Sequence, residues 1–271
     1  MPELPEVETT RLGITPLIKL QRIKKVIIRD DRLRWKIPPV LKTKLQQQQI
    51  LDVKRRGKYL LFSTSAGCVI LHLGMSGSLR YLRADTPVKK HDHVDIIFTN
   101  GDCIRFNDPR RFGALLWTTE DPLKHPLLVK LGPEPFSDEF NTEYLYRRSR
   151  KRSVAIKNFI MNSQIVVGVG NIYANEALFD AGIKPNIAAG RISKRRYKKL
   201  VEAIPHILEK AIKSGGTTLR DFTASDGKPG YFSQHLNVYG KNDSACTICG
   251  HKIRQITIGQ RASYYCPYCQ H

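Results

Sequence analysis

The sequence has no long apolar run and no recognisable signal peptide. Nowhere do about 18 consecutive apolar residues occur, the minimum for a helix that crosses a membrane. The first residues, MPELPEVE, are acidic and rich in proline, whereas a secretory signal has basic residues followed by an apolar stretch. We therefore expect a cytoplasmic protein, or a nuclear one in a cell with compartments.

Acidic residues are scarce. The 271 residues include 24 Asp and Glu against 45 Lys and Arg, a formal net charge of +21. Such a surplus indicates a polyanionic partner, most often nucleic acid and sometimes a membrane surface, but no long amphipathic basic helix favours a membrane. Residues 144–157 contain six basic residues and no acid. This stretch fits a solvated charged face or phosphate contacts, and the charge of the whole chain favours phosphate contacts.

Cysteine is also scarce, with six in the chain, but four of them form the pattern CxxC–x16–CxxC near its end. These four are Cys246, Cys249, Cys266 and Cys269. Their spacing is typical of a tetrahedral zinc site, and so short a segment needs a metal to fold. Disulfides are the alternative, which we do not expect in a cytosolic chain. His251 and His271 lie nearby as substitute ligands, although four cysteines suffice.

The segment between the two cysteine pairs predicts a β-hairpin, and the two remaining cysteines lie far from these pairs in the chain. Strand-like residues flank Gly259 and Gln260, so Arg261 is expected at the tip of a β-hairpin. Cys68 and Cys103 lie among apolar strand residues, and we predict that both are buried and unreactive.

The part of the chain before residue 120 predicts β-structure. Short apolar or alternating runs occupy residues 57–64, 69–75 and 93–106. Within the last run, the sequence NGD at 100–102 is typical of a hairpin turn. Residues 131–145 are rich in proline and acid, and we expect them to connect two domains.

From residue 166 onward the apolar period is helical. Residues 166–185 contain a glycine turn, Asn171 placed as an N-cap, a short helix and Gly182 as its stop. Ser193 fits the cap of a longer helix that Pro205 should kink or split. Its apolar residues are Tyr197, Leu200, Val201, Ile204, Ile207, Leu208, Ala211 and Ile212, and Gly215 and Gly216 end it. Two helices around a glycine turn are similar to a helix-turn-helix.

The opening MPELPEVE places prolines and glutamates side by side in an otherwise basic chain. A helix N-terminus explains this, because proline suits a first turn and carboxylates suit the positive end of the helix dipole. We expect a helix here, with Val7, Leu12 and Ile14 among its apolar residues. A helix start does not exclude a functional role for the same residues.

Seven motifs in this order resemble formamidopyrimidine-DNA glycosylase, the bacterial family that removes 8-oxoguanine. They are PELPEVE (2–8), GKYLLF (57–62), HLGMSG (72–77), NDPRRFG (107–113), VVGVGNIYANE (166–176), SDGKPGYF (225–232) and QRASYYC (260–266). The resemblance spans the whole chain. PELPEV is similar to this glycosylase and not to the endonuclease VIII branch, which typically opens differently and prefers oxidised pyrimidines.

The resemblance implies an α+β fold with two lobes and DNA in the basic cleft between them. Residues 1–131 are expected to form a β-sandwich with a leading helix, and 132–149 an interdomain connection. Residues 150–236 are expected to form a helical domain with a helix–two-turn–helix, and 237–271 a β-hairpin zinc finger with one structural Zn²⁺. The expected partner is double-stranded damaged DNA, and the expected oligomeric state is a monomer.

The resemblance also implies the catalytic residues. Removal of Met1 leaves Pro2 with a secondary amine, and an α-amino group titrating near 8 is neutral in roughly a tenth of molecules at pH 7. This amine attacks C1′ of the sugar, and the resulting iminium ion drives elimination of the 3′ and then the 5′ phosphate. Glu3 is the partner for proton transfer if burial raises its pKa, whereas Glu6 is a second acid or a structural residue.

Two basic residues complete this expected machinery. The resemblance assigns Lys58 to proton donation in β-elimination, next to a phosphate, in place of an ordinary edge-strand lysine. It assigns Arg261 to phosphate binding and δ-elimination. Because a guanidinium has a pKa above about 12, we favour the phosphate role for Arg261.

A damaged base must leave the stack before it is attacked. The family positions that fill the vacated space correspond to Met75, Arg110 and Phe112. Met75 and Phe112 also suit a core, but two arginines beside Phe112 would be unusual there. Arg110 would hydrogen-bond the orphaned cytosine.

Further DNA contacts of the family correspond to His91, Arg110, Arg152 and Asn171. Other members often have lysine near position 152, and a phosphate contact tolerates arginine. The glycine-rich residues 217–232 resemble the loop that covers the everted purine.

Two other functions stay open on the sequence. One is a sister glycosylase that prefers oxidised pyrimidines. The other is a zinc-ribbon nucleic-acid binder without enzymatic activity. The charge and the four cysteines support the binder equally well, and only PELPEV and Lys58 argue against it.

Overall fold

The computed structural model describes residues 2–216 and 232–271, which form two units. The first unit contains residues 2–129 and 214–216, and the second contains 130–213 and 232–271. Met1 and residues 217–231, which include most of the predicted base-covering loop, lie outside the described residues. In the described part of the chain, no helix has the length and apolar character needed to span a membrane.

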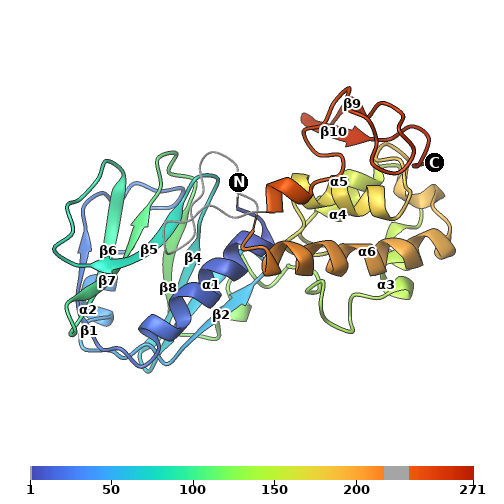
Figure 1. Cartoon of the computed structure of the whole chain (residues 1–271). Helices are drawn as coiled ribbons and strands as arrows, with labels where there is room; N and C mark the ends of the chain where they lie inside the picture. The colour runs from blue at the N-terminus through green and yellow to red at the C-terminus, as the bar shows by residue number, and fades with distance from the viewer. Residues whose placement is uncertain (1, 217–231) are drawn as a thin grey trace. The chain divides into compact units, whose positions relative to one another are not determined.

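The first unit is built from two four-stranded antiparallel sheets, as the sandwich prediction requires (Figure 1). One sheet has the order β1-β6-β7-β5: β1 (Ile23–Ile28), β6 (Asp92–Phe98), β7 (Asp102–Asn107) and β5 (Ser78–Arg83). The other has the order β2-β3-β4-β8: β2 (Asp52–Arg56), β3 (Tyr59–Thr64), β4 (Gly67–His72) and β8 (Ala114–Thr118). The predicted NGD turn joins β6 to β7, where Gly101 has a positive φ of 89° that glycine adopts without strain.

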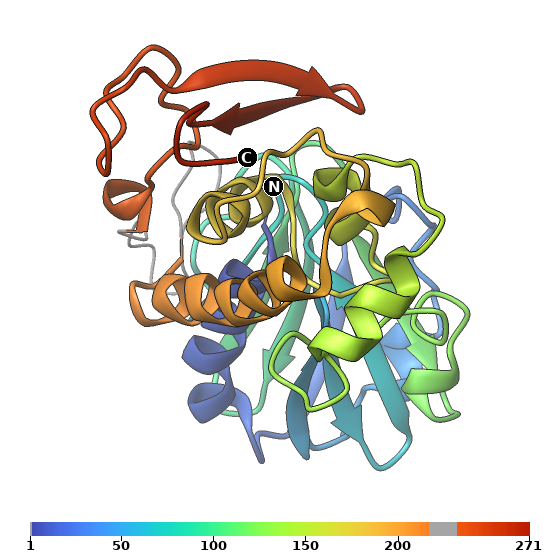
Figure 2. The same cartoon turned by 90° about the vertical axis from the view of Figure 1, so that its right-hand side faces the viewer.

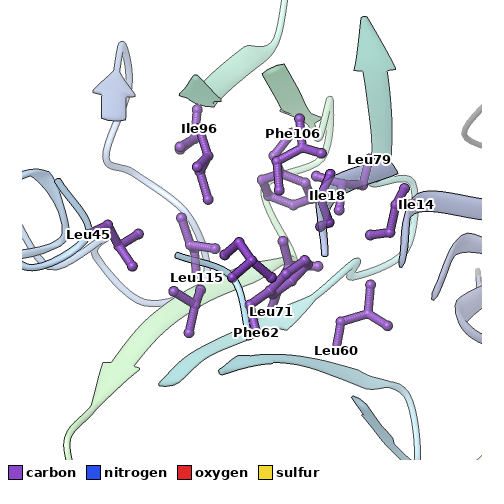
Figure 3. Packing of buried hydrophobic residues seen from close by; sticks show 14 of the residues in the cluster. Ile14, Ile18, Leu45, Leu60, Phe62, Leu71, Leu79, Ile96, Phe106 and Leu115 are labelled. Carbon is purple, nitrogen blue, oxygen red and sulfur yellow. The ribbon is translucent and has the colours of Figure 1, made fainter. Parts of the chain in front are cut away.

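The sandwich core has side chains from both sheets and from the leading helix α1 (Leu4–Ile18) (Figure 3). The short α2 (Leu41–Lys44), which packs beside β1, adds Leu41 to the same core. Labelled examples are Leu60, Phe62, Leu71, Leu115, Leu79, Ile96, Phe106, Ile14 and Ile18, all of which are buried. Full burial of each such side chain contributes about 1.5–3 kcal/mol. This unit therefore has a large apolar core. Leu12, expected among the apolar residues of α1, is 48% exposed.

In its described residues the second unit contains four α-helices: α3 (Thr142–Ser149), α4 (Ile156–Met161), α5 (Asn171–Asp180) and α6 (Lys194–Lys213). Helix α3 lies within the range 132–149, for which we expected a connection. Helix α6 begins directly after Ser193, as predicted, and ends before Gly215 and Gly216, both of which have positive φ.

Pro205 does not split α6, which is one continuous helix (Figure 2). Proline removes one backbone hydrogen bond from a helix. The buried face of α6 extends on both sides of it, from Tyr197 to Ala211, and this packing stabilises the helix across the missing bond.

The last part of the second unit is the predicted β-hairpin, formed by β9 (Arg254–Ile258) and β10 (Arg261–Tyr265). Its apolar cluster is small and consists of Phe179, Val238, Cys246, Ile253 and Cys266. Two of these five residues are predicted metal ligands. Apolar burial in this region is therefore much smaller than in the sandwich.

Candidate active site

The N-terminus of α1 is held by a reciprocal pair of glutamates. Glu3 is the N-cap, and its carboxylate accepts the backbone N–H of Glu6. The Glu6 carboxylate in turn accepts the backbone N–H of Glu3 at 2.8 Å. Pro2 is buried, and Glu3 is 2% exposed. This capping box fixes the backbone directly after Pro2 and gives Glu6 a structural role at this site.

Lys58 lies in the turn between β2 and β3, and not within an edge strand. Arg55 holds this turn by donating from Nη1 to the carbonyl oxygen of Gly57 at 2.9 Å, while its Nε donates to Glu8 of α1 at 2.9 Å. Burial raises the pKa of Glu8, but hydrogen bonds and charge from Arg11 and Arg55 outweigh it, so the pKa lies below its usual range. An ionised Glu8 therefore ties the Lys58 turn to the helix that begins at Pro2 and Glu3.

His72, at the end of β4, is a neighbour of Lys58 that sequence reasoning missed. Burial, followed by the positive charges of Lys58 and Arg34, lowers the pKa of His72 to about 4. Its Nδ1 accepts the backbone N–H of Gly74 at 2.9 Å. At neutral pH the ring is therefore uncharged, with its proton on Nε2. His72 lies within the motif HLGMSG, in which a role was predicted only for Met75.

Asp108 brings together the two segments that carry the predicted wedge. One carboxylate oxygen accepts the hydroxyl of Ser76 at 3.1 Å, and the other accepts the backbone N–H of Gly113 at 2.7 Å. These partners follow Met75 and Phe112 directly in the chain. Asp108 is fully buried and was not identified from the sequence.

The residues predicted to form the wedge are not core residues. Phe112 is 44% exposed and Met75 is half-buried. The exposed Arg110 guanidinium lies over the Phe112 ring, 5.1 Å from its centroid. Phe112 is therefore not part of the apolar core, which is compatible with the predicted wedge.

His91 lies at the entrance to β6 with a positive φ of 72°. Its carbonyl oxygen accepts the backbone N–H of Asp108 at 3.1 Å, which links it to the wedge segment. The half-buried side chain is near His93, with 6.3 Å between ring centroids. The hydrogen bond to Asp108 thus holds the backbone of His91 in a left-handed conformation that residues other than glycine seldom adopt.

The sequence predicted that Asn171 caps α5, and this prediction was wrong. Gly170 is the N-cap, and Asn171 is the first residue of the helix. The Asn171 side chain instead donates from Nδ2 to the carbonyl oxygen of Ala262 in β10 at 3.2 Å. This contact across 91 positions outweighed the local capping preference.

Lys157 and Asn175 also hold β10. The buried Lys157 ammonium donates to the carbonyl oxygen of Ala262 at 2.8 Å and to the hydroxyl of Ser263 at 2.6 Å. Asn175 accepts the backbone N–H of Tyr264 at 2.7 Å. Neither residue was singled out from the sequence, because nothing local marks a contact to a strand so distant.

Arg261 is exposed and begins β10 at the hairpin tip, as predicted. The tip lies close to α4, since a Cβ on Gly259 would come within 2.5 Å of Asn158 Nδ2. Arg152, also exposed, follows α3 in the stretch rich in basic residues. Both guanidinium groups are accessible to an anionic ligand.

The four C-terminal cysteines fit a metal ion. Their Sγ atoms all lie within 4.8 Å of one another, with 3.9 Å between Cys246 and Cys269 and 3.4 Å between Cys249 and Cys266. A tetrahedral zinc site with Zn–S bonds of about 2.3 Å has sulfur atoms roughly 3.8 Å apart. All four cysteines are free thiols and not disulfides.

The pKa values of the cysteine thiols also indicate a site for a cation. Burial raises the pKa of Cys246, but backbone N–H donors outweigh it and hold the value at about 7. Burial and the neighbouring sulfur atoms raise the pKa of Cys269. Four adjacent thiols do not all ionise without a compensating positive charge. By contrast, burial raises the pKa of Cys68 and of Cys103 to about 11, as expected for unreactive core thiols.

The chain resembles known proteins over its full length. A model of the formamidopyrimidine-DNA glycosylase N-terminal domain matches residues 1–115, and a model of the formamidopyrimidine-DNA glycosylase H2TH domain matches residues 131–223. The formamidopyrimidine-DNA glycosylase of Nitrosococcus oceani is 58% identical over 271 residues, 100% of both chains.

Two solved structures of the Lactococcus lactis Fpg protein are also similar. A mutant of that protein, in complex with DNA containing Fapy-dG, has a TM-score of 0.93 at 34% identity over 100% of both chains. The wild-type protein, in complex with DNA containing an oxidised pyrimidine, has a TM-score of 0.92 at 33% identity, again over 100% of both chains.

Proposed function

Because the chain belongs to the formamidopyrimidine-DNA glycosylase family of DNA repair enzymes, we propose that it excises 8-oxoguanine and formamidopyrimidines from duplex DNA and then cleaves the strand as an abasic-site lyase. One observation carries this proposal: the buried Glu3 carboxylate follows Pro2 directly, and Glu6 fixes the backbone between them. A nucleophile and an acid are thus held at one helix terminus.

Pro2 is the proposed nucleophile. After loss of Met1, its neutral secondary amine attacks C1′ of the damaged nucleotide and releases a proton as the C1′–N bond to the base breaks. The C1′–O4′ bond then breaks, the ring oxygen takes a proton, and the lone pair of the proline nitrogen forms the iminium ion with C1′. This ion withdraws electrons from the opened sugar. Loss of a C2′ proton then expels the 3′ phosphate, and a second elimination expels the 5′ phosphate.

Glu3 supplies the proton that the sugar ring oxygen or the departing base needs as the bond breaks. Lys58 donates a proton during β-elimination, in a turn kept in place by Arg55. The permanently charged Arg261 clamps a phosphate beside the reacting sugar.

Met75, Arg110 and Phe112 fill the space left by the everted base, and Arg110 hydrogen-bonds the unpaired cytosine. His91, Arg152 and Asn171 contact DNA phosphates, with Asn171 at the start of a helix where anions are favoured. The four cysteines hold one structural Zn²⁺, which supplies folding energy and no chemistry to the reaction. We further propose that the protein acts as a monomer in the cytoplasm.

Borohydride trapping tests this function directly. The protein with a free Pro2 is mixed with duplexes containing 8-oxoguanine or thymine glycol, and the covalent product of the reduced iminium ion is measured. We expect rapid trapping on 8-oxoguanine, slower trapping on thymine glycol, and none when Met1 is retained by an N-terminal extension. Full trapping by the extended protein would exclude Pro2 as the nucleophile, and faster trapping on thymine glycol would contradict the purine preference.

A further inference from the structure

A cavity of about 410 Å³ lies in the first unit, beside the wedge segment but outside the residues assigned above, apart from Arg110. It is lined by Ser76, Ser78, Arg80, Lys89, Lys90, Asn107, Pro109 and Arg110. Four of these eight side chains are cationic, none is acidic, and three more are neutral and polar. This composition is that of an anion site.

Arg80 lines this cavity and is held in place by a buried carboxylate. Its Nη2 donates to Asp92, but its Nε–H is buried and has no hydrogen-bond partner among the described residues. A buried N–H without a partner costs about 1–3 kcal/mol, and the burial of this atom also keeps it out of reach of a ligand in the cavity. The charge of the lining, and not this donor, therefore indicates an anionic ligand.

The lysine segment of the cavity has a fixed backbone. The Lys89 N–H donates to Asp92 at 2.8 Å, and the Lys90 carbonyl oxygen accepts from Asn107 Nδ2 at 3.0 Å. Both lysine side chains are exposed at the cavity rim. Their charges are thus presented from a rigid segment, which reduces the entropy lost on binding.

The nearest carboxylates do not neutralise the rim. Asp92 is buried behind the cavity, where it pairs with Arg80 and lies 3.7 Å from Arg105. Asp108 is also buried and accepts from Ser76 and Gly113. Neither carboxylate forms an ion pair with the side chain of Lys89, Lys90 or Arg110 in the described structure.

We infer that this cavity binds a phosphate group, with Lys89 and Lys90 as the charged rim. The inference rests on the proposed function, under which the phosphate is a backbone diester of the bound DNA. Because Arg110 lines the same cavity, that diester lies next to the wedge. The site adds a phosphate contact to those of His91, Arg152, Asn171 and Arg261.

The test measures binding without chemistry. Affinity for a duplex containing a tetrahydrofuran abasic analogue is measured at several salt concentrations for wild type and for the double variant Lys89→Gln/Lys90→Gln. We expect weaker binding and a salt slope smaller by about 1, the effect of one lost phosphate contact. The matched control is Lys24→Gln/Lys25→Gln, two exposed lysines on β1 at the opposite edge of the same sheet.

Unchanged binding by Lys89→Gln/Lys90→Gln would overturn the inference, and so would an equal loss in the control pair, which would show only the effect of overall charge. These binding measurements need no catalysis, so they test the phosphate site independently of the proposed function. The proposed function is contradicted by a different result, the absence of trapping of the wild type on 8-oxoguanine.

A second experiment distinguishes a backbone diester from a free phosphate. Duplexes with one neutral methylphosphonate at successive positions are bound to both proteins. We expect one position at which neutralisation weakens wild type severalfold and leaves the double variant unaffected. Equal losses at every position, with competition by inorganic phosphate that Lys89→Gln/Lys90→Gln abolishes, would identify a free-phosphate site and overturn the DNA assignment.

Discussion

The two regions proposed to act on DNA are stabilised in different ways. The N-terminus of α1 is fixed by Glu3 and Glu6, three residues apart, on a sandwich with a large apolar core. The hairpin of Arg261 is fixed by Lys157, Asn171 and Asn175, 89 to 106 positions away, and by four cysteines. Local contacts and apolar burial therefore support the proposed nucleophile, while long-range polar contacts and a cysteine cluster that fits a metal support the proposed phosphate clamp.

Removal of the metal should have the largest effect, and it should affect the hairpin but not the sandwich. Structural zinc contributes on the order of 10 kcal/mol to small zinc domains, so chelation or Cys249→Ser should unfold the hairpin and greatly weaken DNA binding. The sandwich should stay folded. Both tryptophans, Trp35 and Trp117, lie in the first unit, so their fluorescence reports on it alone.

Cys68→Ala, which changes a core thiol, is the control and should leave the metal content unchanged. Unaltered DNA affinity in the metal-free protein would show that the hairpin does not depend on the cysteines.

Lys157→Met should have a smaller effect, confined to the second unit. It removes the ammonium that donates to Ala262 and Ser263, at a cost of about 1–3 kcal/mol in the free energy of unfolding. DNA affinity should fall while zinc stays bound, and hydrogen exchange at β10 amides would locate the loosening. Lys199→Met, an exposed change on α6, is the control. Equal effects of the two substitutions would contradict the role of Lys157 in positioning β10.

The smallest effect concerns the first unit at mildly acid pH. The folded pKa of His72 is about 4 against an ordinary 6.5, so the unfolded chain binds this proton first as the pH falls. Stability should decline from pH 6.5 toward pH 4, by roughly 2 kcal/mol between pH 7 and 5 from this group. Tryptophan-monitored unfolding of wild type and His72→Gln at both pH values measures it. Identical pH dependence in both proteins would contradict a neutral His72.

The sequence predicted the features that are local. The cysteine spacing, the helix at MPELPEVE, the NGD turn and the start of α6 at Ser193 depend on neighbours in the chain, and the structure confirms each. The predictions that were wrong concern positions where contacts with residues distant in the chain determine the structure. Asn171 was expected to cap α5, but its amide donates to Ala262.

Three site residues were missed for the same reason. Asp108 acts by joining Ser76 to Gly113, Lys157 by reaching β10, and His72 by its burial near Lys58. A single sequence shows the type of each residue but not its partners. Only the resemblance to a family assigned the wedge, because exposure of Phe112 cannot be inferred from apolar patterning.

The central claim is that Pro2 and Glu3 divide the chemistry between them. An abasic sugar already presents an aldehyde to the amine, whereas release of an intact base also needs a proton from an acid, an assistance worth on the order of 10²–10⁴ in rate. The most direct measurement runs Glu3→Gln side by side on 8-oxoguanine and abasic duplexes, with Pro2→Gly as the comparison. We expect Glu3→Gln nearly to eliminate base release and largely to spare abasic cleavage, while Pro2→Gly weakens both. Equal slowing of the two reactions by Glu3→Gln would contradict its assignment as the acid.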